Sequence, residues 1–426
     1  MNKLSTASID AAPIPASTRF DILDALRGFA LFGIFFANVQ FFAGWLFIDS
    51  QAKASIEGAR IYDAFLLLVV DGRFYTIFSF LFGLGFALQL SRLESKVATK
   101  ANSLYLRRLT ILLLISLIHL CVFWVGDILL LYALLGYVLF FMRKCADRKL
   151  LVIAALLFVL PIPGYYLFWK LGIDPSLGLY QVASYLVDGS DDISGFFTGF
   201  YEAVHTTSLV RYVELNMEIA IGRIGYYFDT WRIPKVLGIM LLGMWAGRQL
   251  IAGKLLENTA LLKKTIIFGL IVGLPSSIVY ANLAGLNTFQ AHSPDGFLSV
   301  IIYMLAVFPL AFTYIAIFAL LWRKYPSVLD VFAAPGRMAL SNYLLQTFLG
   351  ISIFYGIGFG LHLKGGPLSL VAIAIAVFVL QIIVSNLWFR YFAYGPAEWI
   401  WRMLTYGKRL PIRRVMSLQT LRKVQK

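Results

Sequence analysis

Long apolar segments alternate with short polar segments along most of the chain. Crossing a hydrocarbon core of about 30 Å takes roughly 20 helical residues, and ten apolar blocks approach or exceed that length. The blocks cover residues 22–48, 72–91, 105–125, 128–142, 149–169, 234–251, 265–286, 297–321, 337–361 and 367–392. Runs such as LTILLLISLIHLCVFWV are apolar on every face, which favours helices over the alternating strands of a membrane barrel. We therefore predict an all-α polytopic membrane protein with about ten transmembrane helices.

The segment 170–233 lacks a membrane-length apolar run and separates helices one to five (22–169) from helices six to ten (234–392). Its aromatic and charged residues recur at helical intervals, so we expect an extracytoplasmic amphipathic segment. It forms either a cap over the bundle or a wall of a substrate site. Residues 1–21 are the predicted cytoplasmic N-terminal segment, without a cleavable signal, and residues 393–426 form a basic cytoplasmic tail.

The composition excludes a water-soluble enzyme, because 60% of the residues are hydrophobic, 14% are charged and the mean hydropathy is +0.79. A net charge of +15 would suggest nucleic acid in a soluble protein. With both chain ends in the cytoplasm, most of the 37 Lys and Arg residues fall in inner segments, while acidic residues outnumber basic ones outside. We therefore expect the basic residues to interact with lipid headgroups of the bilayer, and we expect no nucleic-acid partner.

The two cysteines, Cys121 and Cys145, fall on opposite sides of the membrane in this topology, which excludes an intramolecular disulfide. Their spacing gives no metal-binding pattern. His205 and His292 lie in outer regions and His362 lies at an outer helix end, where solvated histidines are expected.

Polar residues within the apolar blocks are the candidates for function, since each is costly unless it is paired or lines a cavity. In the first block, Asp24 and Arg27 are three residues apart and can form an ion pair near the inner surface. Asn38 follows Arg27 by 11 residues, about three turns along the same stripe. The structural alternative is an ion pair at the helix end plus an interhelical hydrogen bond from Asn38.

In the second block, Asp71 and Arg73 fall at the predicted outer mouth, and Gly83 and Gly85 are interpreted as sites of close helix packing. In the third, His119 is deep in an unbroken apolar helix and Asp127 follows a short turn. A carboxylate that orients a buried imidazole favours a general base. The alternative is a neutral histidine that donates one hydrogen bond to a neighbouring helix.

A polar stripe is predicted on the ninth helix. Arg337 near the inner surface is followed by Ser341, Asn342 and Gln346. Downstream, Glu398 and Arg402 are four residues apart on a short helix, where interfacial anchoring is the plain interpretation.

Five segments carry a family resemblance. They are LDALRGFALFGIFFAN (23–38), GRFYTIFSFLFGLGF (72–86), RRL with IHL and GDILLLYALLG (107–136), GRMALSNYLLQ (336–346) and YGPAEWIWRMLTYG (394–407). In this order, and over nearly the whole chain, they resemble the bacterial YeiB family of membrane proteins of unknown function, also called DUF418. The resemblance implies a bacterial inner-membrane location and a loosely transport-related role.

The DxLRGxA opening also resembles, more distantly, the transmembrane acyltransferase superfamily. That superfamily includes the acyltransferase-3 proteins and the heparan-α-glucosaminide N-acetyltransferases. The resemblance implies about ten helices and transfer of an acyl group from cytoplasmic acyl-CoA to an acceptor on the far side. A catalytic histidine of the acyltransferase-3 pattern falls where this chain has Asn38, and residues 49–71 lack the histidine of the glucosaminide branch.

We therefore expect His119, oriented by Asp127, to act as the general base and Asn38 to polarise the acyl carbonyl. Acyl-CoA is the expected co-substrate, and no permanently bound cofactor or metal is expected. The candidate substrate-binding residues are Asp24, Arg27, Arg73, Arg337, Ser341, Asn342 and Gln346, and the candidate CoA-binding residues are Arg107 and Arg108. The acceptor would be a lipid, a glycan or a small molecule.

Two other functions remain open from the sequence. A transporter could use the same intramembrane polar residues as a substrate or proton path. A noncatalytic lipid-binding or structural membrane protein is the third interpretation. The prolines lie mainly at the ends of the apolar blocks, with Pro275 and Pro309 as exceptions, which gives little support to mid-membrane breaks typical of carriers.

Overall fold

A computed structural model describes residues 21–253, 255, 258–283 and 293–414. The regular secondary structure of this part of the chain is helical, with turns and loops between the helices and one isolated bridge between Phe392 and Arg413. The predicted N-terminal segment except Asp21, the last part of the tail and His292 lie outside the described residues.

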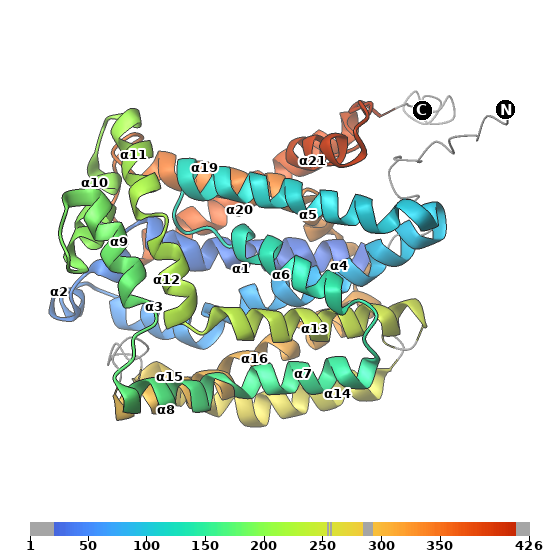
Figure 1. Cartoon of the computed structure of the whole chain (residues 1–426), viewed down its shortest axis with the longest axis horizontal. Helices are drawn as coiled ribbons and strands as arrows, with labels where there is room; N and C mark the ends of the chain where they lie inside the picture. Colours follow the sequence, from blue (N-terminus) through green and yellow to red (C-terminus); the bar gives the residue numbers. More distant parts are fainter. Residues whose placement is uncertain (1–20, 254, 256–257, 284–292, 415–426) are drawn as a thin grey trace.

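Each of the ten apolar blocks forms a helix or a pair of nearly continuous helices that runs along the bundle (Figure 1). These are α1 (Asp21–Phe42), α4 (Arg73–Val97), α5 (Ala101–Ile118), α6 (Leu129–Met142), α7 (Asp147–Val159) with α8 (Pro161–Leu171), α13 (Arg232–Ile251), α14 (Thr259–Phe268) with α15 (Leu274–Leu283), α16 (Pro294–Lys324), α19 (Ala339–Phe354) and α20 (Pro367–Tyr391). Seven helical stretches among the described residues are long and apolar enough to cross a membrane, and α6 and α19 are shorter apolar helices. The chain is a multi-pass membrane protein.

Short helices gather at the two ends of the bundle. At one end lie α2 (Ser50–Ala54), α3 (Ala59–Phe65), α9 (Leu177–Asp188), α10 (Ser194–His205), α11 (Leu209–Ile219) and α12 (Gly222–Asp229). At the other end lie α17 (Pro326–Leu329), α18 (Ala333–Arg337) and α21 (Pro396–Tyr406). We call these the cap end and the α21 end. Figure 1 shows α9, α10 and α11 on the left and α21 on the right. The expected amphipathic segment 170–233 is thus a set of short helices.

Irregular turns interrupt or extend the long helices. They are η2 (Trp45–Phe47), η3 (Leu66–Val70), η4 (Ala98–Lys100), η5 (His119–Phe123), η6 (Gly269–Gly273) and η8 (Asp330–Phe332). Three of them, η3, η5 and η6, are wide π-helical turns. Such turns occur frequently at functional sites in other proteins.

Two helices end earlier than the apolar blocks predict. The block 337–361 leaves the helix after Phe354, because Tyr355 is extended and the GIGFG sequence that follows folds back in a loop. There the amide of Gly356 donates to the carbonyl of Val204 in the cap, 2.8 Å away. The block 22–48 leaves its helix after Phe42, and Gly44 follows with φ 75°. Hydropathy alone does not predict where these helices end, since the residues of the turns are as apolar as those of the helices.

Small residues bring the helices that frame the interior into close contact. A Cβ atom on Gly83 of α4 would lie 1.9 Å from the carbonyl oxygen of Met240 in α13. Cβ atoms on Gly243 and Gly247 of α13, one turn apart, would lie 2.1 Å from the carbonyl oxygen of Phe80 and 2.8 Å from that of Leu84 in α4. This arrangement resembles the small-residue packing of membrane helices. The prediction that Gly83 is a packing residue is confirmed.

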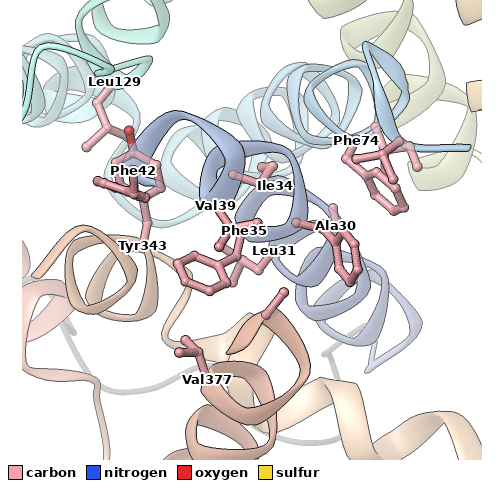
Figure 2. Close-up of a cluster of buried hydrophobic side chains, with 14 of the residues drawn as sticks. Ala30, Leu31, Ile34, Phe35, Val39, Phe42, Phe74, Leu129, Tyr343 and Val377 are labelled. Carbon is pink, nitrogen blue, oxygen red and sulfur yellow. The ribbon is translucent and has the colours of Figure 1, made fainter. Parts of the chain in front are cut away.

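The largest buried cluster surrounds α1. It joins α1 to α4, α19 and α20 through residues such as Phe74, Tyr343 and Val377 (Figure 2). Apolar side chains also cover the outer surface of the bundle, among them Phe141 with 74% and Leu368 with 82% of its surface exposed. Apolar groups on both the inside and the outside are what a lipid-embedded bundle requires.

Candidate functional site

Two cavities extend into the bundle from its two ends. The large cavity has a volume of about 1320 Å³ and is lined mainly by the cap end of α1, by α3, by η3 and by α15, with a few residues each from α4, α12 and α13. The small cavity has a volume of about 280 Å³ and is lined by the α21 end of α1, α4, α5 and α18 together with α21. Three residues line both of them, namely Ile34, Ile128 and Tyr343. We call these three side chains the junction.

The helix α1 connects the two cavities through one face. Arg27 lines the small cavity, Ile34 lies at the junction and Asn38 lines the large cavity. The positions 27, 34 and 38 repeat at seven and four residues, so their side chains share a face of the helix. The predicted stripe from Arg27 to Asn38 is therefore present, and its two ends lie about 16 Å apart along the axis.

Arginines dominate the polar lining of the small cavity. They are Arg27, Arg92, Arg108, Arg337 and Arg402, against two acidic residues, Asp24 and Glu398. Arg27 Nη1 lies 2.9 Å from Asp24 Oδ1, which confirms the predicted ion pair. Three other guanidinium groups stack over aromatic rings, with the Arg108 group 3.6 Å from the centre of the Trp401 ring. The excess of fixed positive charge favours an anionic ligand.

One wall of the small cavity forms where the backbone of α1 packs closely against α18 and the residue before it. A Cβ atom on Gly28 would lie 2.0 Å from the carbonyl oxygen of Phe332, and one on Gly336 would lie 1.8 Å from that of Asp24. Arg27 and Arg337 are the chain neighbours of these two glycines, and both line the small cavity. Gly85 of α4 leaves room on the opposite side, since a Cβ atom there would lie 3.1 Å from Arg27 Nη2.

Glu398 fixes the position of α21 against α19. Its Oε1 accepts hydrogen bonds from the amides of Leu340 (2.7 Å) and Ser341 (3.1 Å), and its Oε2 accepts one from the Ser341 hydroxyl (2.5 Å). Glu398 thus satisfies free amides at the start of α19, as a capping residue does. Burial raises the pKa of its carboxyl group, although these hydrogen bonds partly offset the effect.

His119 and Asp127 form a buried pair beside the junction. Their side chains are 2% and 0% exposed, and His119 Nδ1 lies 2.7 Å from Asp127 Oδ2. His119 Nε2 lies 3.0 Å from the hydroxyl of Thr347 on α19. The imidazole ring packs 5.2 Å from the ring of Tyr343, measured between centroids. Neither His119 nor Asp127 lines either of these two cavities, whereas Tyr343, which packs against the imidazole, lines both.

Local structure explains why this pair forms. His119 begins the π-helical turn η5, in which the amide of Trp124 donates to the carbonyl of His119 over 2.8 Å. Asp127 stands just before α6, and its second carboxylate oxygen accepts from the amide of Leu130 (2.7 Å). The carboxylate therefore caps α6 while it orients the histidine.

Residues of the cap hold the turn between η5 and α6. Arg223 donates to the carbonyl oxygens of Asp127 (2.7 Å) and Gly126 (3.2 Å), and the Tyr227 hydroxyl donates to that of Asp127 (3.0 Å). Asn216 accepts from the amide of Val125 (3.1 Å) and donates to the carbonyl of Leu120 (2.7 Å). The cap thus reaches down to the centre of the candidate site.

Several predicted site residues have structural contacts instead of a place in a cavity. Arg73 is fully buried and donates to Ser277 of α15 over 2.6 Å. Asn342 donates to Ser385 (3.0 Å) and Gln346 to Gln381 (2.9 Å), both on α20. These hydrogen bonds join helices in the way that polar residues commonly do within membrane bundles.

Two further predicted residues lie at the edge of the small cavity. Ser341 is bonded to Glu398 and does not line the cavity, whereas its neighbour Leu340 does. Arg107 is exposed near Gly407, whereas Arg108 lines the cavity. Of the two predicted CoA-binding residues, only Arg108 therefore lies in a cavity.

Sequence reasoning missed several of the lining residues. Arg92, Trp401 and Arg402 complete the small cavity, and Arg232 and Lys235 line the large one. Arg92 and Arg402 follow apolar runs, where basic residues are explained by the positive-inside rule alone. Arg232 and Lys235 differ, because the positive-inside rule does not explain basic residues on the predicted outer side. Their position at the start of an apolar block was therefore a signal that the sequence offered.

The expectation of a solvated His362 is wrong. The residue is only 9% exposed, because the backbone of Gly44 and the ring of His205 pack against its imidazole. Its ring packs against that of His205, with 4.9 Å between the centroids, and neither ring nitrogen has a hydrogen-bond partner among the described residues. Burial and the neighbouring His205 lower the pKa of His362 from its usual 6.5 to about 4.

Comparison with known proteins finds relatives over nearly the whole chain. The sequence profile of DUF418, a protein of unknown function, matches residues 246–408. The uncharacterized protein YxaH of Bacillus subtilis (strain 168) is 31% identical over 417 residues, which cover 94% of this chain and 97% of YxaH. The uncharacterized protein YeiB of Escherichia coli (strain K12) is 29% identical over 398 residues, 90% of this chain and 95% of YeiB. No solved structure matches significantly. The chain belongs to the DUF418 family and is a homologue of YxaH and YeiB.

Proposed function

We propose that this protein is a membrane-embedded acyltransferase that takes an acyl group from cytoplasmic acyl-CoA and passes it to an acceptor at the opposite membrane face. The observation that carries the proposal is the meeting of two chemically different cavities at Ile34, Ile128 and Tyr343. A donor and an acceptor that enter from opposite ends would bring their reacting groups together there. Such an arrangement supplies proximity and orientation, which reduce the barrier to a two-substrate reaction.

The orientation and the number of crossings are part of the proposal. We propose ten helical crossings with the α21 end and both chain termini in the cytoplasm of a bacterium. The basic segments 92–108, 143–149 and 322–337 connect helices at that end, which agrees with the positive-inside rule. The small cavity then faces cytoplasmic acyl-CoA, and the cap faces the outside.

The small cavity fits a phosphate-bearing donor. Arg27, Arg108 and Arg337 would bind the phosphates or the amide carbonyls of CoA by charge-assisted hydrogen bonds. A volume of about 280 Å³ is at the lower end for ligand pockets, so it suits the narrow acylated arm of CoA while the nucleotide stays at the mouth.

The transfer itself would break the thioester C–S bond and form a C–O or C–N bond to the acceptor. The proton of the acceptor would go to His119, and CoA would leave as a thiol after it takes up a proton. In this proposal Asn38 polarises the acyl carbonyl, because its amide lines the large cavity one turn beyond Ile34. Tyr343 must rotate for His119 to reach the acceptor, since its ring packs against the imidazole and lines both cavities.

Release of free CoA thiol by purified protein in lipid nanodiscs tests the proposal. We expect wild-type protein to consume acyl-CoA, and His119→Ala and Asn38→Ala to slow consumption by about 100-fold. The matched control is His205→Ala, an exposed histidine of the cap that lines neither cavity. Wild-type turnover in His119→Ala would refute the assignment of the base, and no turnover of any acyl-CoA by the wild type would refute the function.

A carrier is the second candidate, because cavities from opposite ends that stop at a common barrier also describe an occluded transport path. The two functions differ in one measurement. Proteoliposomes that take up a solute while acyl-CoA stays intact would favour the carrier. Acyl-CoA consumption without solute movement would favour the acyltransferase.

A further inference from the structure

Two basic side chains lie on one wall of the large cavity, in the first turn of α13. Arg232 and Lys235 are three residues apart, so they share a face of the helix, and both line the cavity. Lys235 is only 3% exposed. A buried ammonium group loses most of its hydration, which is costly unless another group compensates it.

Tyrosines from three other helices surround these cations. The Arg232 guanidinium lies 4.4 Å from the centre of the Tyr75 ring and donates to the Tyr226 hydroxyl over 3.1 Å. Lys235 Nζ lies 4.3 Å from the centre of the Tyr303 ring. The hydroxyls of Tyr75 and Tyr303 are 3.1 Å apart. The rings stabilise positive charge, and the hydroxyls add hydrogen-bond donors at the cavity wall.

Basic residues outnumber acidic ones in the lining of the large cavity, which holds Lys53, Arg60, Arg223, Arg232 and Lys235 against Asp49, Asp63 and Asp71. The positive end of the α13 dipole adds to the two cations instead of opposing them. Arg223, which also lines the cavity, contributes a third positive charge. Among the acidic residues of the lining, Asp63 is bonded to Trp45 (2.6 Å) and lies 3.7 Å from Lys53. Asp71 also lines the cavity, and its carboxylate interacts electrostatically with Arg232 and Lys235, so it offsets part of their positive charge.

We infer that the large cavity binds a phosphate group at Arg232 and Lys235, with the hydroxyls of Tyr75, Tyr226 and Tyr303 as further partners. Guanidinium, ammonium and phenol groups are all donors, which match the several acceptor oxygens of a phosphate. The inference concerns binding alone and does not depend on acyl transfer.

The rim of the cavity indicates where a lipid could enter. Ile61 of α3 and Ile278 of α15 line the cavity and are 78% and 50% exposed. Apolar side chains at an open rim can accommodate acyl chains, while the headgroup phosphate reaches Arg232. A soluble phosphate compound without acyl chains would contact only the wall that carries Arg232 and Lys235.

Binding to the full-length protein in a maltoside detergent, which carries no phosphate, tests the inference. The probes are dihexanoyl phosphatidylglycerol, glycerol 1-phosphate and dihexanoylglycerol, and the readout is a saturable rise of the unfolding temperature. We expect the first probe to bind and the phosphate-free diglyceride not to bind. Binding of glycerol 1-phosphate with equal affinity would assign the site to soluble phosphate compounds, and its absence would assign the site to a lipid headgroup.

Variants connect binding to the proposed residues. Arg232→Gln and Lys235→Met should each weaken binding of phosphatidylglycerol about tenfold. The matched control is Lys170→Gln, since Lys170 also stacks on an aromatic ring, 4.1 Å from Trp169, but does not line the cavity. Unchanged affinity in both variants, equal binding of the diglyceride or no saturable binding to the wild type would overturn the inference. If either variant fails to fold, Tyr226→Phe provides the test instead. We expect this variant to weaken the binding of phosphatidylglycerol about threefold.

Discussion

The backbone of Gly336 lies directly against the carbonyl oxygen of Asp24, where a Cβ atom would stand only 1.8 Å from that oxygen. This contact holds α18 to α1 at the point where Asp24 pairs with Arg27. The arginines of the small cavity therefore depend on the absence of a side chain at position 336.

Gly336→Ala should lower the free energy of unfolding by about 1–3 kcal/mol, because the added methyl group forces two backbones apart. Thermal unfolding in detergent measures the effect. The matched control is Gly178→Ala in α9, where a Cβ atom would meet nothing within 4 Å and alanine favours the helix. An equal unfolding temperature for Gly336→Ala and wild type would contradict the packing described for α1 and α18.

Neighbouring arginines should respond differently to acyl-CoA. Arg108→Gln removes a guanidinium from the small cavity and should weaken stabilisation by acyl-CoA about tenfold, while Arg107→Gln should leave it unchanged. The unfolding temperature as a function of acyl-CoA concentration gives both affinities. Equal losses in the two variants would show that surface charge, and not the cavity, attracts the donor.

Removal of the Asp127 carboxylate should be costly even without any catalytic role. Asp127→Ala loses the hydrogen bond to His119 and the cap of α6, so the free energy of unfolding should fall by about 2–3 kcal/mol. Asp191→Ala, at an exposed position of the cap, is the control and should have little effect. Denaturant unfolding of the two variants side by side makes the comparison, and similar midpoints would argue against the buried pair.

Acidification should weaken the contact between the cap and the loop after α19. The pKa of His362 is about 4 in the folded protein and near 6.5 when the residue is solvated. Its neutral form therefore favours folding, so this contribution is complete above pH 6.5 and is lost as the pH falls toward 4. The loss amounts to at most about 3 kcal/mol. His362→Phe should flatten the acid side of the stability curve, and an unchanged slope would refute the assignment.

Cysteine labelling in intact cells can establish the orientation. In a background without Cys121 and Cys145, Phe359→Cys should react with a membrane-impermeant maleimide, because Phe359 is 77% exposed in the loop near the cap. Lys144→Cys, in the turn between α6 and α7 at the other end, should react only after the cells are permeabilised. The reverse pattern would invert the proposed topology.

The sequence predicted the helices well, since an apolar run of membrane length leaves the backbone few alternatives. It also identified two pairings within short distances of the chain, Asp24 with Arg27 and His119 with Asp127. Asp24 and Arg27 are three residues apart on one helix, and only η5 and the short segment before α6 separate His119 from Asp127, so spacing in the chain limits which side chains can meet.

The cavities could not be predicted in the same way. Arg92 and Arg402 are more than 300 residues apart in the chain, and no periodicity relates them. Likewise, the polar stripe on α19 could face a cavity or another helix, and only the packing of α20 shows that Asn342 and Gln346 bond to Ser385 and Gln381. Which face of a membrane helix meets a neighbour depends on the whole bundle, not on its own sequence.

The junction of Ile34, Ile128 and Tyr343 has an electrical consequence. If water fills both cavities, the insulating layer of the membrane is reduced locally to the thickness of these side chains, and the membrane voltage falls mainly across them. A charge carried past Tyr343 would then experience nearly the full potential, worth about 2.3 kcal/mol per 100 mV. Three uncharged side chains would thus have to block protons and ions as effectively as a whole bilayer does elsewhere.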